Sequence, residues 1–292
     1  MDGILIINKT KNCTSHDIVY KTKKILQEKV GHTGTLDPNA TGVLPLLIGK
    51  ATQISKYLIN HDKIYQAQIQ LGEKRTTGDI EGEIIEQKEV IEANLQKENI
   101  GKVFDKIKGK QKQIPPIYSA IKVKGKKLYE YARKGESIEI EPREIEIYNI
   151  KLLNIDKINK TIDFEVECSK GTYIRSLCED IAERLGNIGY MKELKRIKVG
   201  EFDLKASITV EELEENINNK EFLKNKIISI EQYFKNNPSL ELQENKIKLL
   251  LNGVQLEYNV NDNLYKIYNT KKEFIGLATV KNKLLKRDII VN

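Results

Sequence analysis

The chain has 292 residues, of which 39% are hydrophobic and 31% charged, with 6 prolines, and this composition is typical of folded proteins rather than disordered ones. Its length suffices for one large domain or for a large and a small one. A formal net charge of +7 favours a polyanionic partner, although a coding bias toward lysine would also produce it. The odd set Cys13, Cys168 and Cys178 contains no Cys-x-x-Cys, which argues against a disulfide framework or a zinc site.

The N-terminal region predicts one strand and one helix. Gly3 to Ile7 is a short apolar run typical of a buried strand. Thr14-Ser15-His16-Asp17 is a capping sequence, and the helix that it starts should reach about Leu26. Neither a signal-like start nor an apolar run of membrane-spanning length is present, so we expect a cytoplasmic protein with no membrane contact.

Residues 30–45 are rich in glycine and proline and predict an irregular loop that continues neither a helix nor a strand. Asp37 is the only acid between Lys29 and His61. Because it precedes Pro38, its backbone is restricted, and a lone carboxylate on a constrained loop is a candidate nucleophile or general base. The alternative is an Asp that starts an Asx or proline turn, and this stretch alone favours that alternative.

Two other chemistries fit this loop poorly. A phosphate-binding loop needs a glycine where Leu44 stands and a hydroxyl where Ala51 stands. A metal site needs a second acid or imidazole at ligand spacing, and only His32 lies near Asp37.

Residues 63–72 alternate between apolar and polar side chains, which predicts a half-buried strand whose inner face begins with Tyr65. By pattern alone, Tyr65 is an ordinary aromatic residue at a strand end. A further strand is expected at 83–90 and a helix at about 94–108.

From residue 106 to residue 134 the chain is strongly basic. Tyr118, Tyr129 and Tyr131 are interleaved with the cations, and Glu130 is the single acid. The basic residues are Lys106, Lys108, Lys110, Lys112, Lys122, Lys124, Lys126, Lys127, Arg133 and Lys134. Lysines bind phosphates and aromatic faces stack on unpaired bases, so the stretch favours RNA binding, with a solvated surface loop as the alternative.

A strand at 162–168 and a helix at 174–185 follow. Arg175 lies in the first turn of that helix, where the helix dipole disfavours a cation by roughly 0.3 to 1 kcal/mol. We therefore expect an anionic partner for it, or else an exposed arginine that tolerates this small cost.

The C-terminal part begins after a break at Asn236-Asn237-Pro238. A helical turn around residues 249–251 and three strand-like runs at 264–268, 274–280 and 289–291 follow. This pattern predicts a small separate β domain.

The loop sequence from Gly31 to Leu44 resembles the signature Gly-His-Thr-Gly-Thr-Leu-Asp-Pro-x-Ala-Thr-Gly-Val-Leu of the TruB family of tRNA pseudouridine synthases, and it matches at every defined position. Residues 171–177 likewise match the family's Gly-Thr-Tyr-Ile-Arg-x-Leu, and residues 62–65 match its Asp/Ser-Lys-x-Tyr. The family's opening motif is kept at Lys9, while Thr10 and Asn12 replace a proline and a glycine.

The resemblance implies a fold and a domain division. We expect an α+β catalytic domain over residues 1–236, built on a mixed, mainly antiparallel sheet. A thumb-like RNA-binding insertion is expected at about 106–145. Residues 237–292 are expected to form a PUA-like RNA-binding β-barrel.

The resemblance also implies roles for individual residues. Asp37, Tyr65 and Arg175 would be catalytic: the aspartate reacts with the nucleoside, the tyrosine stacks on the base and is a candidate base in the proton shift, and the arginine keeps the aspartate ionised. The residues expected to contact substrate or RNA are His32, which would fill the place of the flipped base, Tyr173, Leu194, Lys9 and Lys122.

The activity implied is isomerisation of uridine to pseudouridine at position 55 in the T-loop of tRNA, after base flipping. Attack at C1′, addition at C6 and removal of a sugar proton all remain open. No metal or organic cofactor is implied, the T-arm of tRNA would be the partner, and we expect a monomer. The alternative is a tRNA-binding folding chaperone in which catalysis is dispensable, and a DNA-binding module is disfavoured because no recognition helix emerges.

Overall fold

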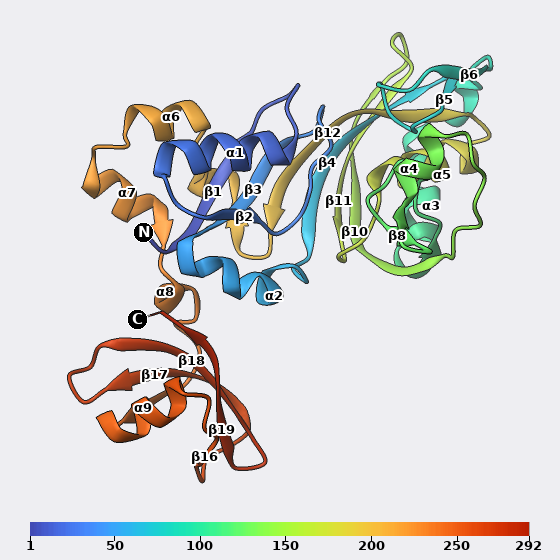
Figure 1. The fold of residues 1–292 in the computed structure, drawn as a ribbon. Helices are drawn as coiled ribbons and strands as arrows, with labels where there is room; N and C mark the ends of the chain where they lie inside the picture. The colour runs from blue at the N-terminus through green and yellow to red at the C-terminus, as the bar shows by residue number, and fades with distance from the viewer. Residues whose placement is uncertain (292) are drawn as a thin grey trace.

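The computed structural model describes residues 1–291, which form a large and a small sheet, two short hairpins and nine α-helices (Figure 1). The strands of the large sheet are β1 (Gly3–Lys9), β2 (Val30–His32), β3 (Thr41–Ile48), β4 (Lys63–Leu71), β7 (Gly109–Gln113), β10 (Arg143–Asp156), β11 (Thr161–Cys168), β12 (Gly189–Val199), β13 (Phe202–Asp203) and β14 (Ile227–Ile228). Their order is β14-β1-β3-β12-β4-β11-β10-β7, with β2 beside β3 and β13 beside β12. In residues 1–291 only the β3–β12 pair of this sheet is parallel, which confirms the mixed, mainly antiparallel α+β architecture.

Helices and hairpins surround this sheet. The α-helices are α1 (Ser15–Leu26), α2 (Ser55–Leu58), α3 (Lys97–Ile107), α4 (Leu128–Arg133), α5 (Ile174–Arg184), α6 (Val210–Glu215), α7 (Lys220–Lys226), α8 (Ile230–Tyr233) and α9 (Glu244–Leu251). The 3₁₀ helices are η1 (Gly49–Ile54), η2 (Glu92–Asn94) and η3 (Leu204–Ala206). The hairpins are β5 (Glu73–Arg75) with β6 (Ile84–Gln87) and β8 (Lys122–Val123) with β9 (Lys126–Lys127).

The large sheet has two halves that meet at the β3–β12 pair. This junction is short, since only Lys195 pairs with Thr41 and Arg196 with Gly42. On one half, β1 and β3 share an apolar core with α1, α6 and α7. On the other half, β4, β10, β11 and β12 share a core with α3 and α5. Figure 1 shows β12 and β4 running as long strands from one half into the other.

The region expected to be irregular is only partly so. Residues 30–32 and 41–48 are strands β2 and β3, and the irregular backbone is confined to residues 33–40. The prediction was wrong about residue 45 because a proline usually marks a break. Here β1 pairs along one edge of β3, whereas on the other edge β12 reaches only residue 42 and β2 begins at residue 46. A proline is tolerated where one edge of a strand is unpaired.

The departure from the family at residue 12 has a simple structural reason. Asn12 has a φ of +61°, which is the left-handed region that glycine adopts freely. Asparagine is among the residues that tolerate this conformation best. The turn that leads to α1 is therefore kept without the glycine, and the capping box between Thr14 and Asp17 forms as expected.

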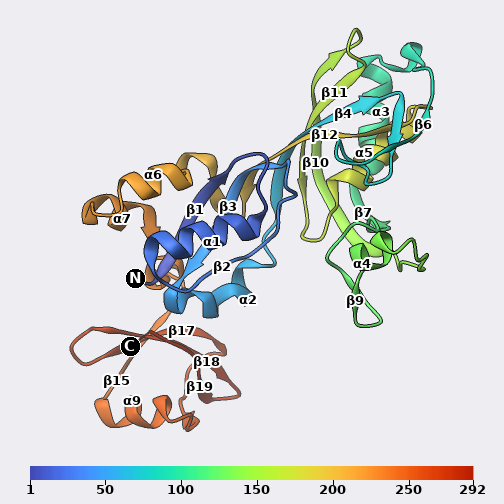
Figure 2. The same ribbon diagram turned by 45° about the horizontal axis from the view of Figure 1, so that its top comes forward.

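The basic insertion is narrower than residues 106–145. Its two ends belong to the large sheet, because β7 pairs with β10. The pairing runs from Gly109 opposite Ile147 to Gln113 opposite Arg143. The part outside the sheet is residues 114–142, which contain β8, β9 and α4. Figure 2 shows α4 and β9 projecting from the half of the molecule that contains β10, β11 and α5.

The strand expected at 83–90 is also shorter than its pattern suggested. It is β6, and all four of its residues are exposed. Because β6 pairs only with β5 in a separate hairpin, its isoleucines gain no core contact. The expected helix at 94–108 is α3, which begins three residues later.

The small sheet lies at the C-terminus and has the order β15-β17-β18-β19-β16. Its strands are β15 (Ser239–Leu242), β16 (Leu256–Glu257), β17 (Asn263–Asn269), β18 (Phe274–Lys281) and β19 (Leu284–Ile290). It is a curled half-barrel with α9 beside it, which fits the PUA-like fold that was expected (Figure 1). Asp288 of β19 accepts hydrogen bonds from Lys56 and Tyr57 of α2, and Leu277 and Ile289 join the core between the two sheets.

None of the helices in residues 1–291 combines the length and the apolar character that a membrane crossing requires.

Gly42 tests whether the junction between the two halves of the sheet limits stability. Its φ is +106°, and a Cβ there would lie 2.1 Å from the carbonyl oxygen of Arg196, which is backbone and cannot move aside. We expect Gly42→Ala to lower the free energy of unfolding by roughly 1–3 kcal/mol, seen as a lower urea midpoint.

The matched control is Gly101→Ala in α3, where a Cβ meets nothing within 4 Å. There the helix propensity of alanine should raise the free energy of unfolding by up to about 1 kcal/mol. Equal midpoints for the two variants would contradict the packing argument.

Candidate active site

Asp37 lies on the irregular segment 33–40, where β2 leads into β3, at the junction of the two halves of the sheet. The carbonyl of Asp37 accepts the N–H of Ala40 at 3.0 Å, so the residue does start a tight turn with Pro38 in its second position. Starting a turn is therefore compatible with a role of Asp37 as nucleophile or general base. The turn fixes the backbone, and the carboxylate stays 34% exposed.

Lys9 holds this segment from the side of β1. Its side chain is fully buried, and its Nζ donates to the carbonyls of Pro38 at 2.9 Å, Ala40 at 2.6 Å and Thr10 at 2.9 Å. Three acceptors use all three ammonium donors, and burial lowers the pKa of the group. We expected Lys9 to contact RNA. The structure corrects this, since a fully buried ammonium with no free donor positions the Asp37 loop instead.

Two further side chains hold the start of the segment. Ser15 exchanges hydrogen bonds with the backbone of Leu36, accepting at 2.8 Å and donating at 3.2 Å. Arg196 of β12 is 1% exposed and donates to the carbonyls of Gly34 at 3.0 Å, Thr35 at 3.4 Å and Val43 at 2.8 Å. No sequence pattern pointed to Arg196, and only the fold reveals that it anchors the loop.

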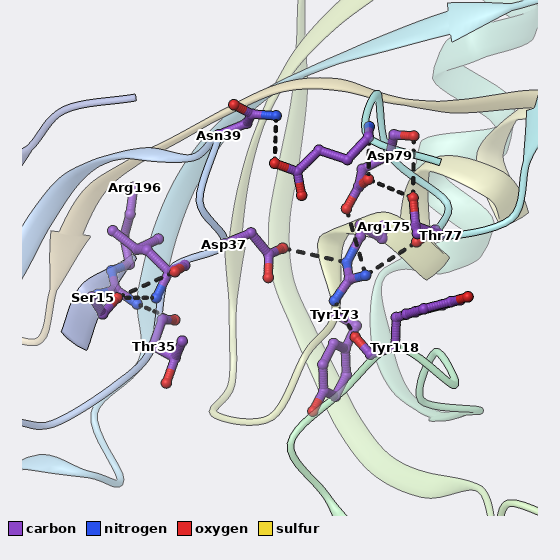
Figure 3. A network of polar contacts seen from close by, with 12 residues as sticks. Ser15, Thr35, Asp37, Asn39, Thr77, Asp79, Tyr118, Tyr173, Arg175 and Arg196 are labelled. Carbon is purple, nitrogen blue, oxygen red and sulfur yellow. Dashed lines mark hydrogen bonds and ion pairs between the residues drawn. The ribbon is translucent and has the colours of Figure 1, made fainter. Parts of the chain in front are cut away.

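Arg175 provides the charge partner of Asp37. It lies in the first turn of α5, is 7% exposed, and its Nε is 3.3 Å from Asp37 Oδ2 (Figure 3). Its Nη1 donates to the carbonyl of Thr77 at 3.1 Å and its Nη2 to that of Tyr118 at 2.9 Å. The anionic partner predicted for Arg175 is therefore present, and both Nη atoms donate to backbone carbonyls.

Asp79 is a second acid at this arginine that sequence reasoning missed. Its Oδ2 is 3.5 Å from Arg175 Nη1, while its Oδ1 accepts from the Thr77 hydroxyl at 2.5 Å and from the Glu81 N–H at 3.1 Å. In the sequence it lies in a turn before a strand and has no distinguishing neighbour. Only the position of Arg175 between the two loops gives it a function (Figure 3).

The electrostatic balance at Asp37 differs from the one expected. Burial raises the pKa of the Asp37 carboxyl, Arg175 opposes that rise, and the negative charge of Asp79 adds to it. The expectation that Arg175 would keep the aspartate ionised did not include this desolvation or the second acid. The arginine limits the rise of the pKa rather than lowering it below the ordinary value.

Asp37 and Arg175 line a cavity of about 510 Å³ together with Tyr65, Tyr173 and Leu194. Tyr65 pairs across the sheet with Arg196, and Leu194 lies two residues before that arginine on the same strand. Burial raises the pKa of Tyr65, so its hydroxyl carries a proton at neutral pH. Five of the expected site residues are thus gathered from a loop, two strands, a helix and the residue that caps this helix.

The projecting insertion also reaches this cavity. Tyr118, Ser119, Ala120 and Tyr129 are among the lining residues. Gln113, at the end of β7, holds the backbone of Tyr173 through its amide, accepting from the N–H at 2.8 Å and donating to the carbonyl at 3.0 Å. The insertion and the start of α5 are therefore tied together at the cavity wall.

Besides Lys9, two other expected residues are not part of the cavity lining. His32 ends β2, and its Nδ1 accepts the N–H of Gly34 at 3.3 Å. Burial and the nearby charges of Arg196 and His16 lower its pKa, so the ring is neutral near pH 7. Lys122 is exposed on β8. Within residues 1–291, no three side chains of the metal-ligating types gather at this or another place.

Comparison with known proteins gives a family for this arrangement. The model of the TruB family pseudouridylate synthase N-terminal domain matches residues 22–174, and that of the tRNA pseudouridylate synthase B C-terminal domain matches residues 175–235. The protein named tRNA pseudouridine synthase B of Caldanaerobacter subterraneus subsp. tengcongensis is 42% identical over 98% of both chains. The protein of the same name from Oceanobacillus iheyensis is 45% identical over 89% of this chain and 86% of its own.

Solved structures agree on the fold. A Cbf5 chain in a Cbf5-Nop10-Gar1 complex has a TM-score of 0.69 and 25% identity, with 99% of this chain and 84% of that chain covered. A chain of an archaeal Nop10-Cbf5 complex has the same TM-score at 22% identity, with 99% of this chain and 85% of that chain covered. At this identity the similarity supports the fold and nothing more. With a family model over more than half of the chain and relatives above 40% identity over nearly all of it, the chain belongs to the TruB family of pseudouridylate synthases.

Proposed function

We propose that this protein isomerises uridine to pseudouridine in tRNA, at position 55 of the T-loop. The observation that carries the proposal is the contact of Asp37 with Arg175 in a cavity walled by Tyr65 and Leu194. The family and the printed names of its relatives support a pseudouridine synthase that acts on tRNA. The T-loop position is our inference from the family resemblance.

In this proposal Asp37 is the group that reacts with the nucleoside. Its carboxylate is partly exposed toward the cavity while its backbone is fixed, which suits a nucleophile or base that must meet a substrate atom in a defined direction. Attack at C1′, addition at C6 and removal of a sugar proton are all compatible with this placement. Arg175 and Asp79 act as positioning residues for the carboxylate.

The cavity would receive the flipped base. Extrusion of a nucleotide costs a few kcal/mol, which contacts in the pocket must offset. Tyr65, protonated because its burial raises its pKa, would stack on the uracil, with Leu194 as the apolar wall and Tyr173 at the side. His32, neutral and at the foot of the loop, would occupy the place that the base leaves.

The remaining parts of the chain would bind the rest of the tRNA. We propose residues 1–236 as the catalytic domain, residues 114–142 as the thumb that grips the T-arm through residues such as Lys122, and residues 237–292 as a second RNA-binding domain. We further propose a monomer in the cytoplasm. The free thiols of Cys13, Cys168 and Cys178 fit a reducing compartment.

Tritium release from tRNA labelled at C5 of its uridines tests the activity directly, because pseudouridine formation must expel the hydrogen at C5. We expect release by the wild type from one T-loop uridine, and a loss on the order of 10⁴-fold or more in Asp37→Ala. Asp105→Ala, which removes an exposed aspartate of α3, is the control and should retain full activity. Tight tRNA binding by the wild type without release would instead leave the folding-chaperone alternative.

The pH dependence of kcat/KM tests the electrostatics of Asp37, since it reports groups of the free enzyme. The reactive form is the carboxylate, and burial raises its pKa above the ordinary 3.8, so kcat/KM should fall as the pH drops through this raised value. Asp79→Asn removes a negative neighbour and should move this acidic limb to lower pH. Asp105→Asn should leave the limb in place. An acidic limb at the same pH in the wild type and in Asp79→Asn would contradict the assignment.

A further inference from the structure

Lys63 is a buried cation on the wall of the cavity. It is the first residue of β4, and the buried face that it shares continues with Tyr65, Ala67, Ile69 and Leu71. Its side chain is 8% exposed and lines the same cavity as Tyr65, two residues further along the strand. Along the strand, Lys63 and Tyr65 are about 6.6 Å apart. One nucleotide is long enough to contact both side chains. An ammonium group at the end of an apolar face requires a reason, because its burial is costly without a partner.

The partners of this ammonium inside the protein are few. Its Nζ donates to the backbone carbonyl of His61 at 2.5 Å. Among residues 1–291 no carboxylate forms an ion pair with it. Lys170, on the segment between β11 and α5, lines the cavity too, and its Nζ donates to the side chain of Asn60. Two lysines that line one cavity therefore have no carboxylate partner within residues 1–291.

The charges around Lys63 come from each element that packs against it. Burial, then Arg196 of β12 and, to a smaller extent, Lys170 lower its pKa, which lies at about 8. Asp62, its exposed neighbour, and Cys168 of β11 oppose the change. Cys168 offers no compensating charge near neutral pH, because burial raises the pKa of its thiol to about 12. A negative group bound in the cavity would relieve this local excess of positive charge.

We propose that Lys63 binds a phosphate group of the target nucleotide when its base occupies the cavity. This inference rests on the proposed function. A phosphodiester carries a full negative charge before any reaction begins, and Lys63 with Lys170 offers two cations to it. The uracil oxygens of the bound substrate are neutral acceptors and do not match such an excess. Lys63 therefore acts in binding and orientation, whereas Asp37 acts in the chemical step.

Replacing Lys63 separates these roles. For a T-arm hairpin RNA we expect Lys63→Met to raise the Kd about 10- to 100-fold, as for loss of a hydrogen bond to a charged group, while the rate of isomerisation at saturating enzyme changes little. Lys63→Arg should keep most of the affinity. Lys198→Met is the matched control, because Lys198 pairs with Ile64 across the sheet, is exposed and is not among the residues that line the cavity.

Hairpins with one neutral methylphosphonate, placed 5′ or 3′ of the target uridine, identify the phosphate. One of the two hairpins lacks the charge that Lys63 contacts. The wild type should bind this hairpin as weakly as Lys63→Met binds the unmodified one, and Lys63→Met should not raise the Kd for it any further. A Lys63→Met defect of the same size on both neutral hairpins would overturn the proposal. An unchanged Kd with a slower reaction would also overturn it and would assign the lysine to the base. Absence of tritium release by the wild type would refute the proposed function separately, because the binding cycle does not depend on turnover.

The pH dependence of binding gives a second readout. The phosphate requires the protonated amine, so affinity should be complete below about pH 8 and decline as the pH rises through that value, by at most tenfold per unit. Lys63→Arg stays charged and should show no such decline between pH 7 and 9. Identical slopes for the wild type and Lys63→Arg would overturn the proposal.

Discussion

The ion pair between Asp37 and Arg175 is the contact on which the site depends. The aspartate comes from the segment between β2 and β3, and the arginine from the first turn of α5, so the pair joins the two halves of the large sheet. A buried guanidinium must have acceptors for its donors. The carbonyls of Thr77 and Tyr118 accept hydrogen bonds from it, and Asp79 forms a second ion pair with it. The same side chain therefore contacts the β5–β6 turn and the projecting insertion.

The carboxylate of Asp37 is held in place although its backbone belongs to no helix or strand. Lys9, Ser15 and Arg196 reach the segment from β1, α1 and β12, and nearly all of their contacts there are with backbone carbonyls. Irregular backbone leaves carbonyls without partners in a ladder, and buried carbonyls must be satisfied. The side chains that hold the loop therefore also satisfy its buried carbonyls. The carboxylate of Asp37 is not used for this and lines the cavity.

The cavity carries more positive than negative charge. One carboxylate, Asp37, lines it beside four cations, Lys63, Lys170, Arg175 and Arg196. Arg175 and Arg196 are engaged with the protein, one with Asp37 and the other with loop carbonyls. The two lysines donate to uncharged acceptors and lack a carboxylate partner within residues 1–291, and this excess of positive charge is the basis of the phosphate proposal. Burial of Asp37 with Asp79 nearby is the opposing effect, since it makes the carboxylate easier to protonate.

The sequence by itself determined much of this protein. The capping box at Thr14, the alternation along β4 and the first-turn position of Arg175 are properties of neighbouring residues, and the three elements that they predict formed where they were expected. The motif around Asp37 likewise led to the family, because fixed glycines and prolines at fixed spacing leave few other choices. Tertiary structure alone decided the positions of Asp79, Arg196 and Lys9, the strand character of residue 45 and the raised pKa of Asp37. These depend on burial and on contacts between segments far apart in the chain, and no window of sequence contains the partner that sets them.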